Sequence, residues 1–192
     1  MRTPKRAKKL LIFVTSTALT FYVYNLFMSF GIATAVLTSL LVHEAFHFFA
    51  FRRHGFTAGM FFLVLFAGVI PDNDEALKVM PRYQEAFIAI AGPAGNVVLI
   101  LVGALISVVP EWRSFGLTFM ELNASLAAFN LLPFFMLDGA RVAKALYSSA
   151  DEKHDKKIAM VLSACTLPAI GIMLYTRHWH YLPVLFVYGH QR

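Results

Sequence analysis

The sequence has a single cysteine, Cys165, among its 192 residues. One cysteine excludes an internal disulfide, and it also excludes a zinc site built from cysteine pairs. Any metal that this chain binds must therefore be held by histidines and carboxylates.

Charged residues are scarce as well, at 15% of the sequence, whereas 58% of the residues are hydrophobic and the mean hydropathy is +0.63. Soluble domains carry about 25% charged residues, so the amount of apolar side chain excludes an ordinary water-soluble fold. We predict one all-α polytopic membrane domain over residues 1–192, with about five to six transmembrane helices of about 20 residues each. The expected spans are about 10–30, 32–51, 86–109, 115–137 and 158–176, and the apolar stretch 179–189 is too short to assign.

The basic residues predict the orientation in the membrane. The net charge is +6, but lysines and arginines lie between the apolar runs rather than in one patch, so we expect no nucleic-acid partner. If each long helix spans once, only Arg113 and Arg177 fall opposite the remaining basic loops. Short loops rich in Lys and Arg stay in the cytoplasm. We therefore expect a multi-pass integral protein with a cytoplasmic N-terminus and an uncleaved first span.

The segment 56–70 differs from the helical runs around it. It is rich in β-forming residues, contains Gly59 and Gly68, and is followed by Pro71. We predict a short membrane-associated β-hairpin or re-entrant segment here. Non-helical backbone at membrane depth must be covered by protein or line a water-filled cavity, so this segment is expected beside a cavity.

The apolar stretch 32–51 contains the pattern His43-Glu44-Ala45-Phe46-His47. At 3.6 residues per turn, His43 and His47 lie on one face of a helix, so both imidazoles can reach one ion. Glu44 lies close enough to contact a water on that ion, which zinc hydrolases need as a proton acceptor. A charged residue at mid-membrane costs at least ~2.5–3.5 kcal/mol, so these polar residues favour a metal site over chance.

Asp138 is the best candidate for a third protein ligand. It is a lone carboxylate at the end of an apolar run, and Pro133 and Gly139 on either side predict a break in the helix. Asp138 is equally suited to cap a following helix over 140–147, and the sequence leaves both roles open.

A third polar group lies in the stretch 86–109. Gly92, Pro93 and Gly95 favour close helix packing. Asn96 can either hydrogen-bond across helices or support the site, and the sequence does not decide between these roles.

Three motifs occur together and in order: His43-Glu44-x-x-His47, Ala91-Gly92-Pro93-Ala94-Gly95-Asn96, and Asn130-Leu-Leu-Pro133 followed by Leu137-Asp138-Gly139. Over residues 35–145 the chain resembles the site-2 proteases, which are intramembrane zinc metalloproteases, and in particular the minimal branch similar to the sporulation factor protease. The resemblance implies a Zn2+ cofactor held by His43, His47 and Asp138, with Glu44 as the catalytic acid and base. It also implies that Asn130 binds the substrate backbone and that the 56–70 segment offers an edge for an unwound substrate.

The expected function is cleavage of membrane-embedded or membrane-adjacent segments of other membrane proteins, within the lipid bilayer of a bacterial cell membrane. The alternative is a membrane metal transporter or metal-binding scaffold without proteolytic activity. It accounts for the buried ligands but leaves Glu44 without a task.

Overall fold

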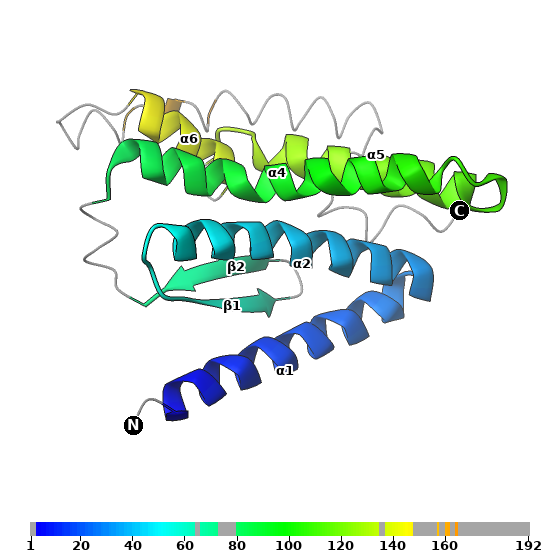
Figure 1. The fold of residues 1–192 in the computed structure, drawn as a ribbon, viewed down its shortest axis with the longest axis horizontal. Coiled ribbons are helices and arrows are strands. Elements are labelled where there is room, and N and C mark those ends of the chain that lie inside the picture. Colours follow the sequence, from blue (N-terminus) through cyan, green and yellow to red (C-terminus); the bar gives the residue numbers. More distant parts are fainter. Residues whose placement is uncertain are drawn as a thin grey trace.

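The computed structural model describes residues 3–63, 66–72, 80–134 and 137–147, together with the single residues 157, 160, 161 and 164. Within the described residues, the elements are two long helices, a β-hairpin, a third long helix, a short 3-10 turn and two further helices (Figure 1). Their bounds are α1 Thr3–Phe27, α2 Phe30–Arg53, β1 Ala58–Leu63, β2 Phe66–Pro71, α4 Arg82–Ile106, η1 Pro110–Trp112, α5 Arg113–Asn130 and α6 Asp138–Tyr147.

The helix α2 carries the histidine motif and has clear signals at both ends. The Ser29 hydroxyl accepts from the Ile32 N–H at the start, and Arg52 and Arg53 occupy the last turn, where positive charge is favourable to the helix dipole. Gly55 follows with a φ of +83°, which glycine adopts without strain. The chain can therefore turn directly from α2 into the hairpin.

The predicted hairpin is confirmed as a two-stranded antiparallel sheet in which Ala58 pairs with Pro71 and Leu63 with Phe66. It lies between α1 and α2 (Figure 1). The Phe62 N–H donates to the Ser16 hydroxyl of α1 at 3.1 Å, and the rings of Phe13 and Phe62 meet edge to face. Lys9 forms an ion pair with Asp72 at the end of the hairpin. The hairpin thus contacts α1 through β1 and through Asp72, which directly follows β2.

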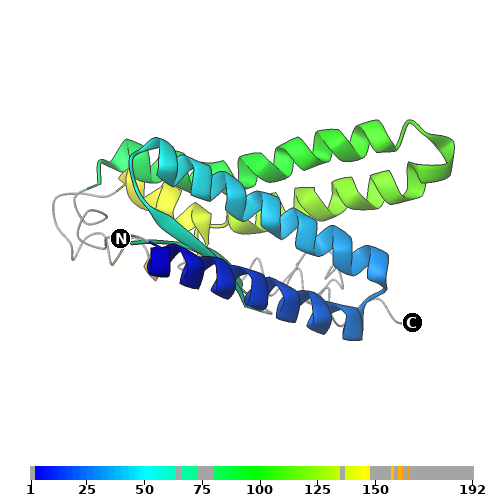
Figure 2. The same cartoon turned by 60° about the horizontal axis from the view of Figure 1, so that its bottom comes forward.

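The helix α4 connects α2 with α5 and α6. It packs against α2 on one side and α5 on another, and the short turn η1 makes α4 and α5 antiparallel neighbours (Figure 2). A buried apolar cluster joins these helices to α1 and includes Tyr24, Val36, Leu99, Phe119 and Leu126. α6 packs on α4, and Lys144 lies 3.6 Å from Glu85 across that contact.

Among the described residues, three helices are long and apolar enough to cross a membrane: Ala7–Phe27, Phe30–Arg53 and Arg82–Ile106. The span expected over 115–137 corresponds to α5, which ends at Asn130 and is not among these three. The stretch 158–176 is described only at single residues, and 179–189 lies outside the described residues. The number of five to six spans therefore stays a prediction.

Candidate metal centre

The helix α2 presents two imidazoles and a carboxylate to the interior of the bundle. His43, Glu44 and His47 are 4%, 6% and 5% exposed. The two rings lie one turn apart, with centroids separated by 4.8 Å, as the helical spacing predicts. Phe49 on the same helix is 66% exposed, so the polar residues of α2 lie on its inward face.

Asp138 approaches these histidines from the opposite side. It is the first residue of α6 and is 8% exposed, although 95 positions separate it from His43. Its placement depends on Gly139, because a Cβ at that position would lie 2.1 Å from the Leu131 carbonyl oxygen. Only glycine lets the start of α6 approach the end of α5 so closely.

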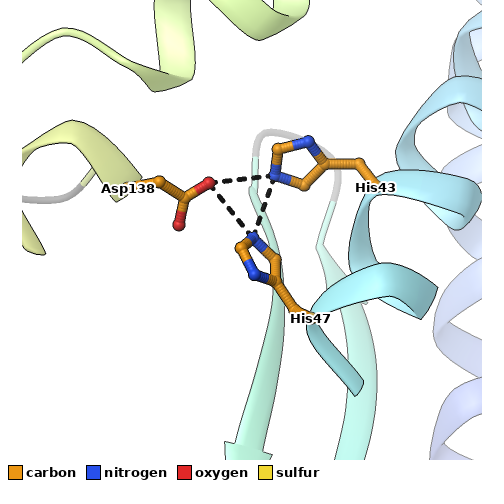
Figure 3. Close-up of side chains that lie close together, drawn as sticks. All are labelled: His43, His47 and Asp138. Atoms are coloured by element: carbon orange, nitrogen blue, oxygen red, sulfur yellow. Dashed lines mark hydrogen bonds and ion pairs between the residues drawn. The ribbon is translucent and has the colours of Figure 1, made fainter. Parts of the chain in front are cut away.

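The three side chains converge on one point (Figure 3). Asp138 Oδ2 lies 3.1 Å from the Nε2 atoms of both His43 and His47, and the two Nε2 atoms are 3.2 Å apart. Two ligand atoms held tetrahedrally at about 2.0–2.1 Å from a zinc ion are about 3.3–3.4 Å apart. The donor set therefore fits one tetrahedrally coordinated ion, with donor atoms of the types that zinc accepts.

The other ring nitrogens have partners of their own. His47 Nδ1 lies 2.7 Å from the Ile88 carbonyl oxygen, and His43 Nδ1 lies 2.6 Å from Asn96 Oδ1. A backbone carbonyl only accepts hydrogen bonds, so His47 Nδ1 must carry the hydrogen. In the neutral ring, Nε2 then keeps its lone pair, which is the form that binds a metal.

Asp138 is buried against both imidazoles, and its Oδ2 atom lies 3.1 Å from each Nε2 atom. An ionised carboxylate among buried imidazoles requires positive charge at their meeting point, either as protons or as a metal ion.

Glu44 is buried beside this centre. It directly follows His43 on α2 and is 6% exposed. Asn130 is the last residue of α5. Its side chain is half-buried, and its amide donates to the Leu126 carbonyl at 3.0 Å. The structure thus brings together His43, His47 and Asp138, and it places Asn130 at the helix end that leads into the Asp138 loop.

The sequence favours close helix packing as the role of Gly92, and the structure places Gly92 directly against the two histidines. A Cβ at Gly92 would lie 2.2 Å from His47 Nε2 and 2.5 Å from His43 Nε2. Gly92 therefore leaves open the space directly in front of the ligand atoms. Gly92 and Asn96 are four residues apart, so they lie on one face of α4. That face is turned toward His43 and His47.

Comparison with known proteins finds relatives among the zinc metalloproteases. Residues 107–170 match peptidase family M50, a stretch that includes Asn130 and Asp138. The chain is 36% identical over 135 residues to a Synechocystis protein provisionally named as a zinc metalloprotease, a match that covers 67% of this chain and 35% of that protein. It is 27% identical over 120 residues to a zinc metalloprotease of Methanocaldococcus jannaschii, covering 59% of this chain and 33% of that protein.

The fold has a solved counterpart in the site-2 protease from Methanocaldococcus jannaschii. The TM-score is 0.60 at 22% sequence identity, and the match covers 88% of this chain and 85% of that chain. The two curated relatives named above are longer, and the matches to this chain cover about a third of the length of each. The resemblance to the site-2 proteases that the three motifs indicate is confirmed by these matches.

Proposed function

We propose that this chain, a relative of the M50 peptidases, is an intramembrane zinc metalloendopeptidase that cuts membrane-embedded or membrane-adjacent segments of other proteins. The observation that carries the proposal is the convergence of two imidazole Nε2 atoms and a carboxylate oxygen at 3.1–3.2 Å in a buried site. The Nδ1 atoms are hydrogen-bonded to Asn96 Oδ1 and to the Ile88 carbonyl oxygen. The lone pairs of the two Nε2 atoms and of the carboxylate oxygen therefore face one another. Such an arrangement is unfavourable unless a cation lies between them.

His43, His47 and Asp138 would hold the zinc, and a fourth position would stay open for water or substrate, as in catalytic zinc sites. Zinc, when bound, supplies the Lewis acidity that makes a water nucleophilic near neutral pH. Glu44 takes the proton of the attacking water and returns a proton to the leaving amine. Glu44 is buried and directly follows His43 on α2, and it is not one of the three residues that converge as ligands.

The depth of the site supports cleavage within the membrane. At 1.5 Å per residue, His47 and His43 lie about 9 Å and 15 Å along α2 from Arg53 at its end. A hydrocarbon core is about 30 Å thick, so the ligands lie between the surface and the midplane. The basic end of α2 is expected in the cytoplasm with the N-terminus, and water would enter from that side.

The hairpin and Asn130 are the parts that we assign to substrate. A helical peptide bond is shielded by its own hydrogen bonds, so the substrate must unwind and can then add to a sheet edge as a strand. On β1 the outward N–H of Phe62 is already bonded to Ser16. We therefore assign the substrate to the outer edge of β2, where the register directs the backbone of Ala67 and Val69 outward. Asn130 would hold the substrate backbone near the metal.

The experiment compares wild type with Glu44→Gln. Zinc content is measured on the purified full-length proteins, and cleavage is measured after co-expression with a panel of single-pass membrane proteins. Glutamine keeps the size of the side chain but cannot accept a proton at this position. We expect zinc content to be unchanged and cleavage to fall by at least about 10²-fold. Zinc flux into vesicles that requires His43 and His47, without any peptide bond cut by wild type, would instead identify a transporter.

A further inference from the structure

Two asparagines lie completely buried between the helices behind the metal centre. Asn96 on α4 and Asn123 on α5 are each 0% exposed. Buried amides in an apolar helix bundle are unfavourable unless each polar atom has a partner. Resting on the metal site proposed above, we propose that Asn96 and Asn123 are positioning residues that hold His43 in its metal-binding tautomer.

The direction of the hydrogen bonds follows from the backbone carbonyl at the far end. Asn123 Nδ2 donates to the Phe119 carbonyl at 2.9 Å, and this carbonyl can only accept. Asn123 Oδ1 therefore faces Asn96 and accepts from Asn96 Nδ2 at 3.0 Å. Asn96 Oδ1 is thus left to face His43 Nδ1 at 2.6 Å. Because Asn96 Oδ1 has no hydrogen, His43 Nδ1 must donate.

This chain of hydrogen bonds determines the chemistry of the opposite ring nitrogen. With its hydrogen on Nδ1, the neutral ring of His43 presents the Nε2 lone pair toward His47 and Asp138. Without the Asn96 acceptor, the hydrogen can move to Nε2, where it would block the metal. The Asn123 amide prevents Asn96 from rotating and presenting its NH2 group to His43 instead.

The two histidines differ in this respect. His47 donates to the Ile88 backbone carbonyl, which no side-chain substitution removes. His43 depends on two side chains from two other helices, so the contact of α4 with α5 is coupled to metal affinity through His43. Ligating histidines commonly depend on such partners, and loss of the partner lowers metal affinity by about 10–100-fold.

The test measures zinc affinity of the full-length protein in detergent, by competition with a chelator. Asn96→Leu has a similar size but neither donor nor acceptor, and we expect its zinc affinity to fall by about 10–100-fold. Asn96→Asp keeps an acceptor for His43 Nδ1 but loses the hydrogen donated to Asn123 Oδ1, so its zinc affinity should fall by less than that of Asn96→Leu. Asn123→Leu frees the Asn96 amide to rotate and should lie between these values.

The matched control is Asn25→Leu, which removes an amide that donates to the Phe21 carbonyl four residues earlier on α1, as Asn123 does on α5. Its zinc affinity should equal that of wild type. The visible spectrum of the Co2+-substituted protein provides a second readout, and it should change in Asn96→Leu but not in Asn25→Leu. If Asn96→Leu fails to fold, Asn96→Asp and Asn123→Leu decide the question in the same assays.

Wild-type zinc affinity in both Asn96→Leu and Asn123→Leu would overturn the inference, as would a loss in Asn96→Asp as large as in Asn96→Leu. Absence of zinc binding by the wild type is a separate result, because it would contradict the proposed function itself.

Discussion

The space in front of the ligand atoms depends on Gly92, and we predict that Gly92→Ala weakens zinc binding. The added Cβ would lie 2.2 Å from His47 Nε2 and 2.5 Å from His43 Nε2, whereas unstrained contacts of a Cβ lie beyond 3.4 Å. The rings cannot withdraw freely, because Asn96 and the Ile88 carbonyl hold their other nitrogens.

The displacement required is thus about 1 Å at both ligands, and overpacking of this kind costs about 1–3 kcal/mol. If the cost falls on the metal-bound state, zinc affinity drops by about 5–150-fold, since about 1.4 kcal/mol corresponds to a factor of ten. The assay is chelator competition on purified protein.

The same substitution at Gly31 is the control, because a Cβ there has no neighbour within 4 Å. Gly31→Ala should leave zinc affinity unchanged. Equal zinc affinity in Gly92→Ala and wild type would refute the placement of Gly92 in front of the ligands.

Three further predictions concern the third ligand, the loop that positions it and the topology. Asp138→Asn should lower zinc retention, because an amide lacks the charge of a carboxylate; unchanged zinc content in Asp138→Ala would assign Asp138 to helix capping alone. Gly139→Ala should destabilise the protein by about 2 kcal/mol or more, measured by thermal unfolding, because the new Cβ would lie 2.1 Å from the Leu131 carbonyl oxygen. On a background in which Cys165 is replaced by serine, a cysteine at Glu111 should react with an impermeant reagent outside intact cells, whereas a cysteine at Lys5 should not; labelling at Lys5 would reverse the topology.

Much of the metal centre is predictable because local rules decide it. The helical period alone places His43 and His47 on one face. Pro133 lacks an N–H and disfavours helical backbone before it, so the run expected over 115–137 stops at Asn130. That early end, followed by Gly139, frees the chain to bring Asp138 back toward α2.

The roles of Gly92 and Asn96 are not decided by local rules. Glycine on a membrane helix ordinarily serves close packing, and the same sequence would do so if α4 were rotated by half a turn. What gives Gly92 and Asn96 their places is the distance from α4 to α2 and α5, which depends on the packing of the whole bundle. The hairpin is an intermediate case, since its β-forming residues predict extended backbone, while its contact with Ser16 depends on where α1 lies.

The most direct test of the account is X-ray absorption at the zinc edge of the purified full-length protein. The account predicts about one zinc per chain, surrounded by nitrogen and oxygen atoms at about 2.0–2.1 Å that include two imidazoles, with no sulfur. The spectrum should change in Asp138→Ala and stay the same in Glu44→Gln, because Glu44 is not a ligand. Absence of zinc, or a wild-type spectrum in His43→Ala and Asp138→Ala, would contradict a catalytic zinc at His43, His47 and Asp138.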